Sequence, residues 1–215
     1  MAEKEVQRFS MSSRIEHILL GVSCIVLMVT GLPIAFHELE IFAYMMGGYG
    51  VTMVLHRVFA IILVFVCLYH CVRHILKIAV IDGKYTRPAL PGLQDVKDVI
   101  QEVKFALGKT DKMPSYGQYS WKEKLDYWGS ILFTPLLVIS GYFLMFPLWT
   151  MTIWPVQYLT GIRLFHRYDA ICVILAYFLH FSNSHLSSKV GMRWTMFTGK
   201  MSKEEAKEEH PLWAE

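Results

Sequence analysis

Two segments of equal length predict the architecture: HRVFAIILVFVCLYH at residues 56–70 and HRYDAICVILAYFLH at residues 166–180. Each is a mainly apolar run with a histidine at both ends. Fourteen residues rise about 21 Å along a helix and complete nearly four turns, so both histidines of a run face the same way. The two stretches therefore predict two long helices that each carry imidazoles at two depths.

Both helices belong to a set of apolar segments that are long enough to cross a bilayer, which takes roughly 20 residues per helix. The composition agrees, because 54% of the residues are hydrophobic and only 18% are charged, against about 25% charged residues in soluble domains. We predict an all-α integral membrane four-helix bundle that forms a single domain over residues 1–215, with no internal repeat. We expect Pro135 to kink or break the third helix. The predicted spans are about 15–36, 52–78, 127–149 and 164–186.

Lysine and arginine are concentrated in the start, in the long second connection at residues 79–124 and in the tail. The first connection has neither residue, and the third has only Arg163 near its end. The positive-inside rule therefore predicts that both termini and the 79–124 segment are cytoplasmic. Within that segment, apolar residues recur every three or four positions and Gly108 follows them. This pattern predicts an amphipathic helix at about 95–107 that lies on the membrane or covers helix ends.

The histidines are the residues that indicate a function. Ionisable side chains inside a bilayer are costly and are usually functional. Two helices that each present histidines at two depths can form two axial ligand pairs for haem iron. Zinc fits badly, because histidines 14 residues apart cannot meet at one ion. The chain has no C-x-x-C-H motif, so the haems would be of the b type, bound without covalent attachment.

The candidate iron ligands are His17, His56, His166 and His180. His17 lies about one turn inside the first span and level with His180, and Gly21 on the same face would leave room for a macrocycle. His70 lies at the same level, so His180 has two alternative partners. A different reading is a haem-free four-helix anchor or transporter, in which the histidines are hydrogen-bonded interior residues.

Three arginines lie near the membrane face opposite the cytoplasmic one, at the level of His56 and His166. Guanidinium groups bind carboxylates through two parallel hydrogen bonds, so Arg57, Arg163 and Arg167 are candidates for the haem propionates. Alternatively, they anchor the helices at the interface or pair with Asp169.

The chain resembles the cytochrome b (gamma) subunit of respiratory formate dehydrogenase and, more loosely, the di-haem cytochrome b subunits of membrane hydrogenases. The resemblance covers nearly the whole chain. It implies that His56 pairs with His166 at a periplasmic haem and His17 with His180 at a cytoplasmic haem. His70 departs from the family pattern and keeps a His70–His180 pair open. The matching stretches are Arg14–His17 with the run to Thr30 and Gly31, Val54–His56, Gly117–Tyr119 leading to Trp128, Ile139–Gly141, Phe165–His166, Leu179–His180 and Gly199–Trp213.

The same resemblance implies a quinone site beside the cytoplasmic haem, at Gly117, Tyr119 and Ser120. The family has asparagine where this chain has Ser120. The implied function is electron transfer between the quinone pool (menaquinone or ubiquinone) and a periplasmic iron–sulfur or multihaem subunit. The substrate active site would lie on a separate catalytic subunit, so no residue of this chain is expected to be catalytic.

We therefore expect a multi-pass protein of the bacterial or archaeal cytoplasmic membrane that contacts lipid, belongs to a larger oligomeric complex and does not bind nucleic acid.

Overall fold

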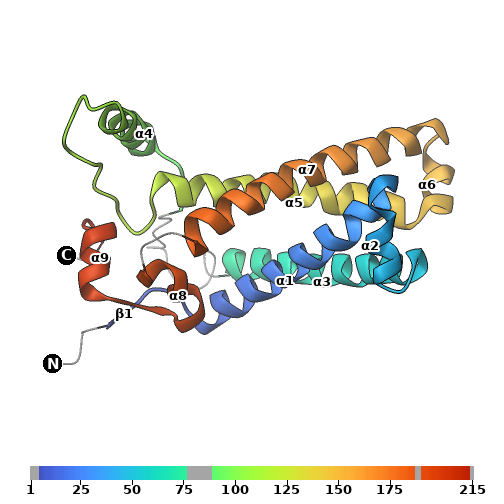
Figure 1. Cartoon of the computed structure of the whole chain (residues 1–215), viewed down its shortest axis with the longest axis horizontal. Helices are drawn as coiled ribbons and strands as arrows, with labels where there is room; N and C mark the ends of the chain where they lie inside the picture. Colours follow the sequence, from blue (N-terminus) through green and yellow to red (C-terminus); the bar gives the residue numbers. More distant parts are fainter. Residues whose placement is uncertain (1–4, 77–88, 187–189, 214–215) are drawn as a thin grey trace. The chain divides into compact units, whose positions relative to one another are not determined.

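The computed structural model describes residues 5–76, 89–186 and 190–213, and most of them are helical (Figure 1). Two short strands, β1 and β2, pair antiparallel with Val6 opposite Met201. The elements in chain order are β1 Glu5–Gln7, α1 Met11–Ala35, η1 His37–Leu39, α2 Glu40–Met45, α3 Tyr49–Leu76, α4 Leu93–Ala106, α5 Trp121–Met145, α6 Pro147–Ile153, α7 Gln157–His185, α8 Val190–Thr198, β2 Lys200–Ser202 and α9 Lys203–Glu209.

Four long helices occupy the positions of the predicted spans, but their ends differ. The predicted third span, 127–149, begins within α5 and runs past its end, since α5 covers Trp121–Met145. It ends there because Pro147 occupies the first turn of α6, where a missing N–H group costs nothing. The helix continues through Pro135 without the break that was one of the two predicted outcomes, and a kink stays a prediction. Residues 77–88, which include the end of the second predicted span and the start of the connection, lie outside the described residues.

Three helices in the described ranges are long and apolar enough to cross a membrane: α1, α3 and α5, with mean hydropathies of 2.4, 2.5 and 1.6 over 18 residues. Helix α7 has 29 residues but carries Arg163, Arg167 and Asp169 in its first half. A fourth crossing therefore stays a prediction.

These helices expose large apolar side chains and bury small polar ones. Phe65 is 67% exposed, whereas Ser23, Thr30 and Thr52 are almost fully buried. Small and hydroxyl-bearing residues between helices are typical of proteins whose outer surface faces lipid.

The chain divides into two compact units. The first comprises residues 1–11, 84–131 and 178–215, and contains the β1–β2 pair, α4, α8 and α9 with the first turns of α5 and the end of α7. The second comprises residues 12–83 and 132–177, and contains most of the membrane-capable helices.

Helix α4 confirms the predicted helix at about 95–107, and Gly108 (φ 67°) follows its last turn. Glu102 fixes the helix in the first unit. Its carboxylate accepts hydrogen bonds from Trp121 Nε1 (2.8 Å) and the Tyr116 hydroxyl (2.9 Å), and it pairs with Lys122. Burial alone would raise the pKa of Glu102, but these three donors outweigh it and hold the pKa below the usual 4.5.

This lowered pKa predicts an acid-sensitive attachment of α4. A carboxylate whose pKa falls on folding contributes stability above its unfolded-state pKa, and this contribution is lost as the pH falls through the folded-state value. We expect hydrogen exchange of α4 amides, corrected for the intrinsic pH dependence, to increase below about pH 4.5. Glu102→Gln should exchange faster already at pH 7 and remove most of the pH dependence. Equal pH profiles for both proteins would contradict the prediction.

Candidate functional site

His56 on α3 and His166 on α7 both lie in the second unit. Both rings are partly buried. The sequence predicted these residues as ligands of one haem, and each ring has a neighbour that prepares it for binding a metal.

Thr30 on α1 fixes the tautomer of His56. The Thr30 Oγ1 atom lies 2.6 Å from the carbonyl oxygen of Val26 and 2.9 Å from His56 Nδ1. A hydroxyl has one hydrogen, and a carbonyl can only accept, so Thr30 donates to Val26 and accepts from the imidazole. Nδ1 therefore carries the proton, which leaves the Nε2 lone pair of His56 available for a metal.

Ser140 on α5 makes the same contacts with His166. Its Oγ atom lies 2.8 Å from the carbonyl oxygen of Leu136 and 2.9 Å from His166 Nδ1. The same argument places the proton on Nδ1 and the lone pair on Nε2. Two neutral imidazoles with free Nε2 atoms are the donor set that a b-type haem requires.

A glycine follows each hydroxyl residue and makes room for the imidazole. A Cβ atom on Gly31 would lie 3.1 Å from Cε1 of His56, and one on Gly141 would lie 3.2 Å from Cε1 of His166. Both distances are tighter than ordinary carbon–carbon contacts, so any larger residue would push the ring.

This close approach gives a prediction with a matched control. Gly141→Ala should displace the His166 ring and weaken haem binding at that level, since overpacking costs about 1–3 kcal/mol. Gly129→Ala on the same helix is the control, because a Cβ there meets nothing within 4 Å. Haem per protein after detergent washing is the measurement. Equal haem loss from both variants would show that Gly141 has no special role.

The matching contacts reveal an internal repeat, so the expectation that none exists is wrong. Thr30 and His56 are 26 residues apart, as are Ser140 and His166. The second pair follows the first by 110 residues (166 minus 56), and Arg167 follows Arg57 by the same interval. The α1–α3 and α5–α7 hairpins therefore place the same residue types at the same positions.

The repeat extends to a second pair of histidines. His70 Nδ1 lies 3.4 Å from a carboxylate oxygen of Glu16, and His180 Nδ1 lies 3.2 Å from one of Asp126. Both separations are 54 residues, and the offset is again 110. Carboxylates accept hydrogen bonds, so His70 and His180 resemble each other in having an acceptor behind the ring.

Around His70 the acceptor is shared. Glu16 is 5% exposed and also binds Arg73 at 2.7 Å, and Arg73 in turn donates to Ser13. The His70 ring lies 4.3 Å from that of His74, between centroids. Glu16 thus forms an ion pair with Arg73 as well as its contact with the imidazole, and Arg73 has no counterpart in the second hairpin, where residue 183 is asparagine.

Of the three arginine candidates, Arg57 and Arg163 are exposed, and Arg167 lies over the Phe36 ring at 5.2 Å. Arg167 Nε and Asp169 Oδ2 are buried and find no hydrogen-bond partner among the described residues. No ion pair within that part of the chain joins Arg167 to Asp169. An unpaired guanidinium nitrogen near His166 fits a haem propionate.

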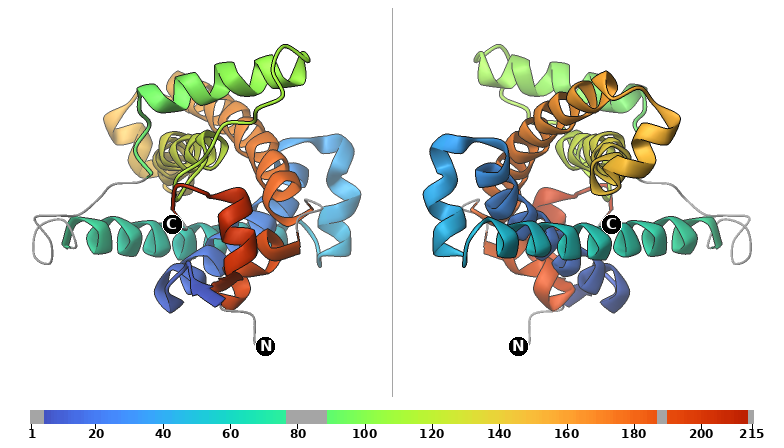
Figure 2. Two further views of the ribbon diagram at one scale, coloured as in Figure 1. Left: turned by 90° about the vertical axis from the view of Figure 1, so that its left-hand side faces the viewer. Right: turned by 90° about the vertical axis from the view of Figure 1, so that its right-hand side faces the viewer.

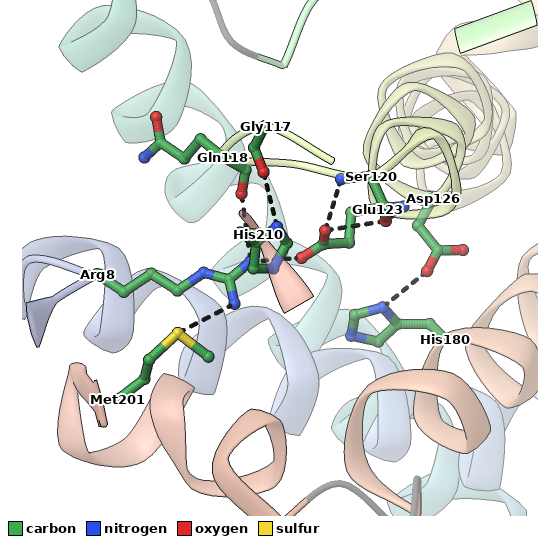
Figure 3. A network of polar contacts seen from close by, with 9 residues as sticks. All are labelled: Arg8, Gly117, Gln118, Ser120, Glu123, Asp126, His180, Met201 and His210. Carbon is green, nitrogen blue, oxygen red and sulfur yellow. Dashed lines mark hydrogen bonds and ion pairs between the residues drawn. The ribbon is translucent and has the colours of Figure 1, made fainter. Parts of the chain in front are cut away.

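The quinone candidates lie at the start of α5 in the first unit (Figure 3). The Gly117 carbonyl accepts from His210 Nδ1 at 2.7 Å. The Ser120 backbone N–H and hydroxyl both contact one carboxylate oxygen of Glu123, at 2.8 and 2.9 Å. Ser120 and Glu123 thus cap α5 in the manner of a capping box. Tyr119 lies between these residues and is partly buried.

Sequence reasoning missed the ion pair beneath this segment. The Arg8 side chain is 1% exposed and binds Glu123 at 2.7 Å. Arg8 also contacts the Gln118 carbonyl (3.4 Å) and Met201 Sδ (3.9 Å) (Figure 3). The spacing of Ser120 and Glu123 was the one available signal, because S-x-x-E marks a helix start. Nothing in the sequence pointed to Arg8 or His210.

Comparison with known proteins supplies the family. Residues 8–199 match the family described as prokaryotic cytochrome b561. None of the curated proteins compared with the chain matches it. The family implies b-type haem, which agrees with the paired imidazoles, and a bacterial membrane, which agrees with the three membrane-capable helices. Because the match covers most of its length, the chain belongs to the prokaryotic cytochrome b561 family and is a multi-pass protein of the bacterial inner membrane.

Proposed function

We propose that this chain is the di-haem membrane subunit of a respiratory oxidoreductase, such as a formate dehydrogenase, and that it moves electrons between a periplasmic partner and the quinone pool. The observation that carries the proposal is the pair of hydroxyl-backed imidazoles at His56 and His166. Their fixed tautomers serve metal binding, whereas a merely structural histidine has no need of a free Nε2 atom.

His56 and His166 would hold one haem, and His180 with His17 the other. The bound haems supply one-electron carriers. A haem held by two imidazoles would supply electron transfer rather than substrate chemistry. Arg57, Arg163 and Arg167 would bind propionates. The protein's own contribution is to orient the rings and to bury them away from water.

The segment from Gly117 to Ser120 would form part of the quinone site, resting on Arg8 and His210. Menaquinone or ubiquinone is the expected substrate. The partners would be a periplasmic iron–sulfur or multihaem subunit and a catalytic subunit that carries the substrate active site.

A reduced-minus-oxidised spectrum of the purified chain tests the haem content directly. We expect a b-type alpha band and two haems per chain by pyridine haemochrome assay. A colourless protein would overturn the proposal and favour a haem-free anchor or transporter. Oxidation of the reduced chain by a quinone analogue, followed at the alpha band, tests the second half of the proposal.

The choice between His17 and His70 as the partner of His180 is also testable. We expect His17→Ala to retain one haem per chain and His70→Ala to retain both. The reason is that Glu16, the acceptor behind His70, is already neutralised by Arg73. Loss of a haem in His70→Ala with none lost in His17→Ala would reverse the assignment.

A further inference from the structure

Helix α4 carries an apolar stripe that its own fold does not cover. Its members recur at intervals of three and four residues, which places them on one face. Each is at least half exposed, from 50% for Ile100 to 84% for Leu93. A surface helix ordinarily turns such a stripe toward the core. The stripe consists of Leu93, Val96, Ile100, Val103 and Leu107.

The acidic face of α4 is the one that contacts the protein. Asp95 binds Lys124 at 2.7 Å, and Glu102 binds Trp121, Tyr116 and Lys122. Asp98, on the same face, is 8% exposed. The helix is therefore oriented by its polar contacts, with its apolar side outward.

Those contacts tie α4 to the first turns of α5, a membrane-capable helix that begins at Trp121. Within the first unit, Figure 2 shows α4 from the side in the views in which the first turns of α5 are seen nearly end-on, so the two axes are strongly inclined. A helix that crosses a bilayer runs roughly along its normal. Helix α4 therefore lies close to the plane of the membrane surface at which α5 starts.

The charges beside the stripe indicate which surface it fits. Lys97 and Lys104 follow Leu93 and Ile100 by one helical turn, and both are exposed on the same flank of the stripe. The acidic residues Asp95 and Glu102 are held in ion pairs on the opposite face. Basic residues that flank an apolar stripe are typical of helices that lie in the interface of anionic membranes.

We infer that α4 is an in-plane interfacial helix whose apolar stripe enters the headgroup region of an anionic phospholipid bilayer. The lysines would contact lipid phosphates, and the ion pairs of Asp95 and Glu102 would transmit this anchoring to the start of α5. The inference does not depend on haem or quinone binding.

Nitroxide labels on the full chain in phosphatidylcholine–phosphatidylglycerol vesicles test this. Labels would be attached at Val96→Cys, Ile100→Cys or Val103→Cys after the four native cysteines are replaced by alanine. Gln94→Cys, on an exposed position away from the stripe, is the control. We expect collisions with oxygen, relative to a water-soluble nickel chelate, to be several-fold more frequent on the stripe than at the control.

Equal nickel access at all four positions would overturn the inference, as would exclusion of both reagents, which would indicate a protein partner. If the cysteine replacements destabilise the chain, the unmodified protein can be cross-linked in vesicles that contain a photoactivatable phospholipid. Adducts that map to residues 93–107 support the inference, and adducts confined to the membrane-spanning helices overturn it.

Discussion

Replacing His166 with alanine should remove one haem and leave the chain with about half of its alpha-band absorbance. The substitution deletes a proposed iron ligand, whose ring lies against Ser140 and Gly141, and one imidazole does not replace two. His56→Ala should have the same effect, because the two imidazoles are expected to bind the same iron. The double variant should therefore lose no more haem than either single variant.

Ser140→Ala is the control for that experiment. It keeps the ligand but removes the acceptor behind it, and outer partners of this kind typically change metal affinity or activity 10–100-fold. We expect Ser140→Ala to bind both haems, with an altered midpoint potential or faster haem loss at one of them. Loss of different haems in His56→Ala and His166→Ala, resolved by their potentials, would show that the residues do not share an iron.

Asp126→Asn should raise the midpoint potential of one haem and leave the other unchanged. The Asp126 carboxylate accepts from Nδ1 of His180 at 3.2 Å, and a negative charge behind a ligand stabilises the oxidised iron. An amide in its place can accept the same hydrogen bond without the charge. We expect roughly a tenfold change in the oxidised-to-reduced ratio at fixed potential, which equals about 59 mV for a one-electron couple.

Asp126→Glu keeps the charge and should stay near the wild-type potential, which separates charge from shape. A redox titration monitored at the alpha band gives both midpoints in each protein. An unchanged pair of potentials in Asp126→Asn, with both haems bound, would remove Asp126 from any role at His180. Absence of haem from the wild type would instead overturn the proposed function itself.

The sequence was sufficient for the long helices and for α4, because apolar periodicity and length determine both. It was not sufficient for the contacts behind the histidines. Thr30 and Ser140 belong to stretches that carry the family resemblance, but only their distances to His56 and His166 show what they do.

The β1–β2 pairing and the Arg8–Glu123 ion pair could not be predicted from the sequence for a related reason. Strands of three residues, as in β1 and β2, carry too short a pattern to recognise, and they pair residues from opposite ends of the chain. Arg8 is buried against Glu123, 115 positions away, and no local signal records such a pairing.

The 110-residue offset also bears on how the protein arose. Apolar positions in the two hairpins have diverged freely, as expected where any lipid-soluble side chain serves. Six positions have the same residue type and the same spacing in both hairpins: a hydroxyl residue, a glycine, a histidine followed by an arginine, a second histidine and an acidic residue. Tandem duplication of a two-helix unit would leave this pattern, and before such a duplication two identical two-helix chains would have bound the cofactor between them.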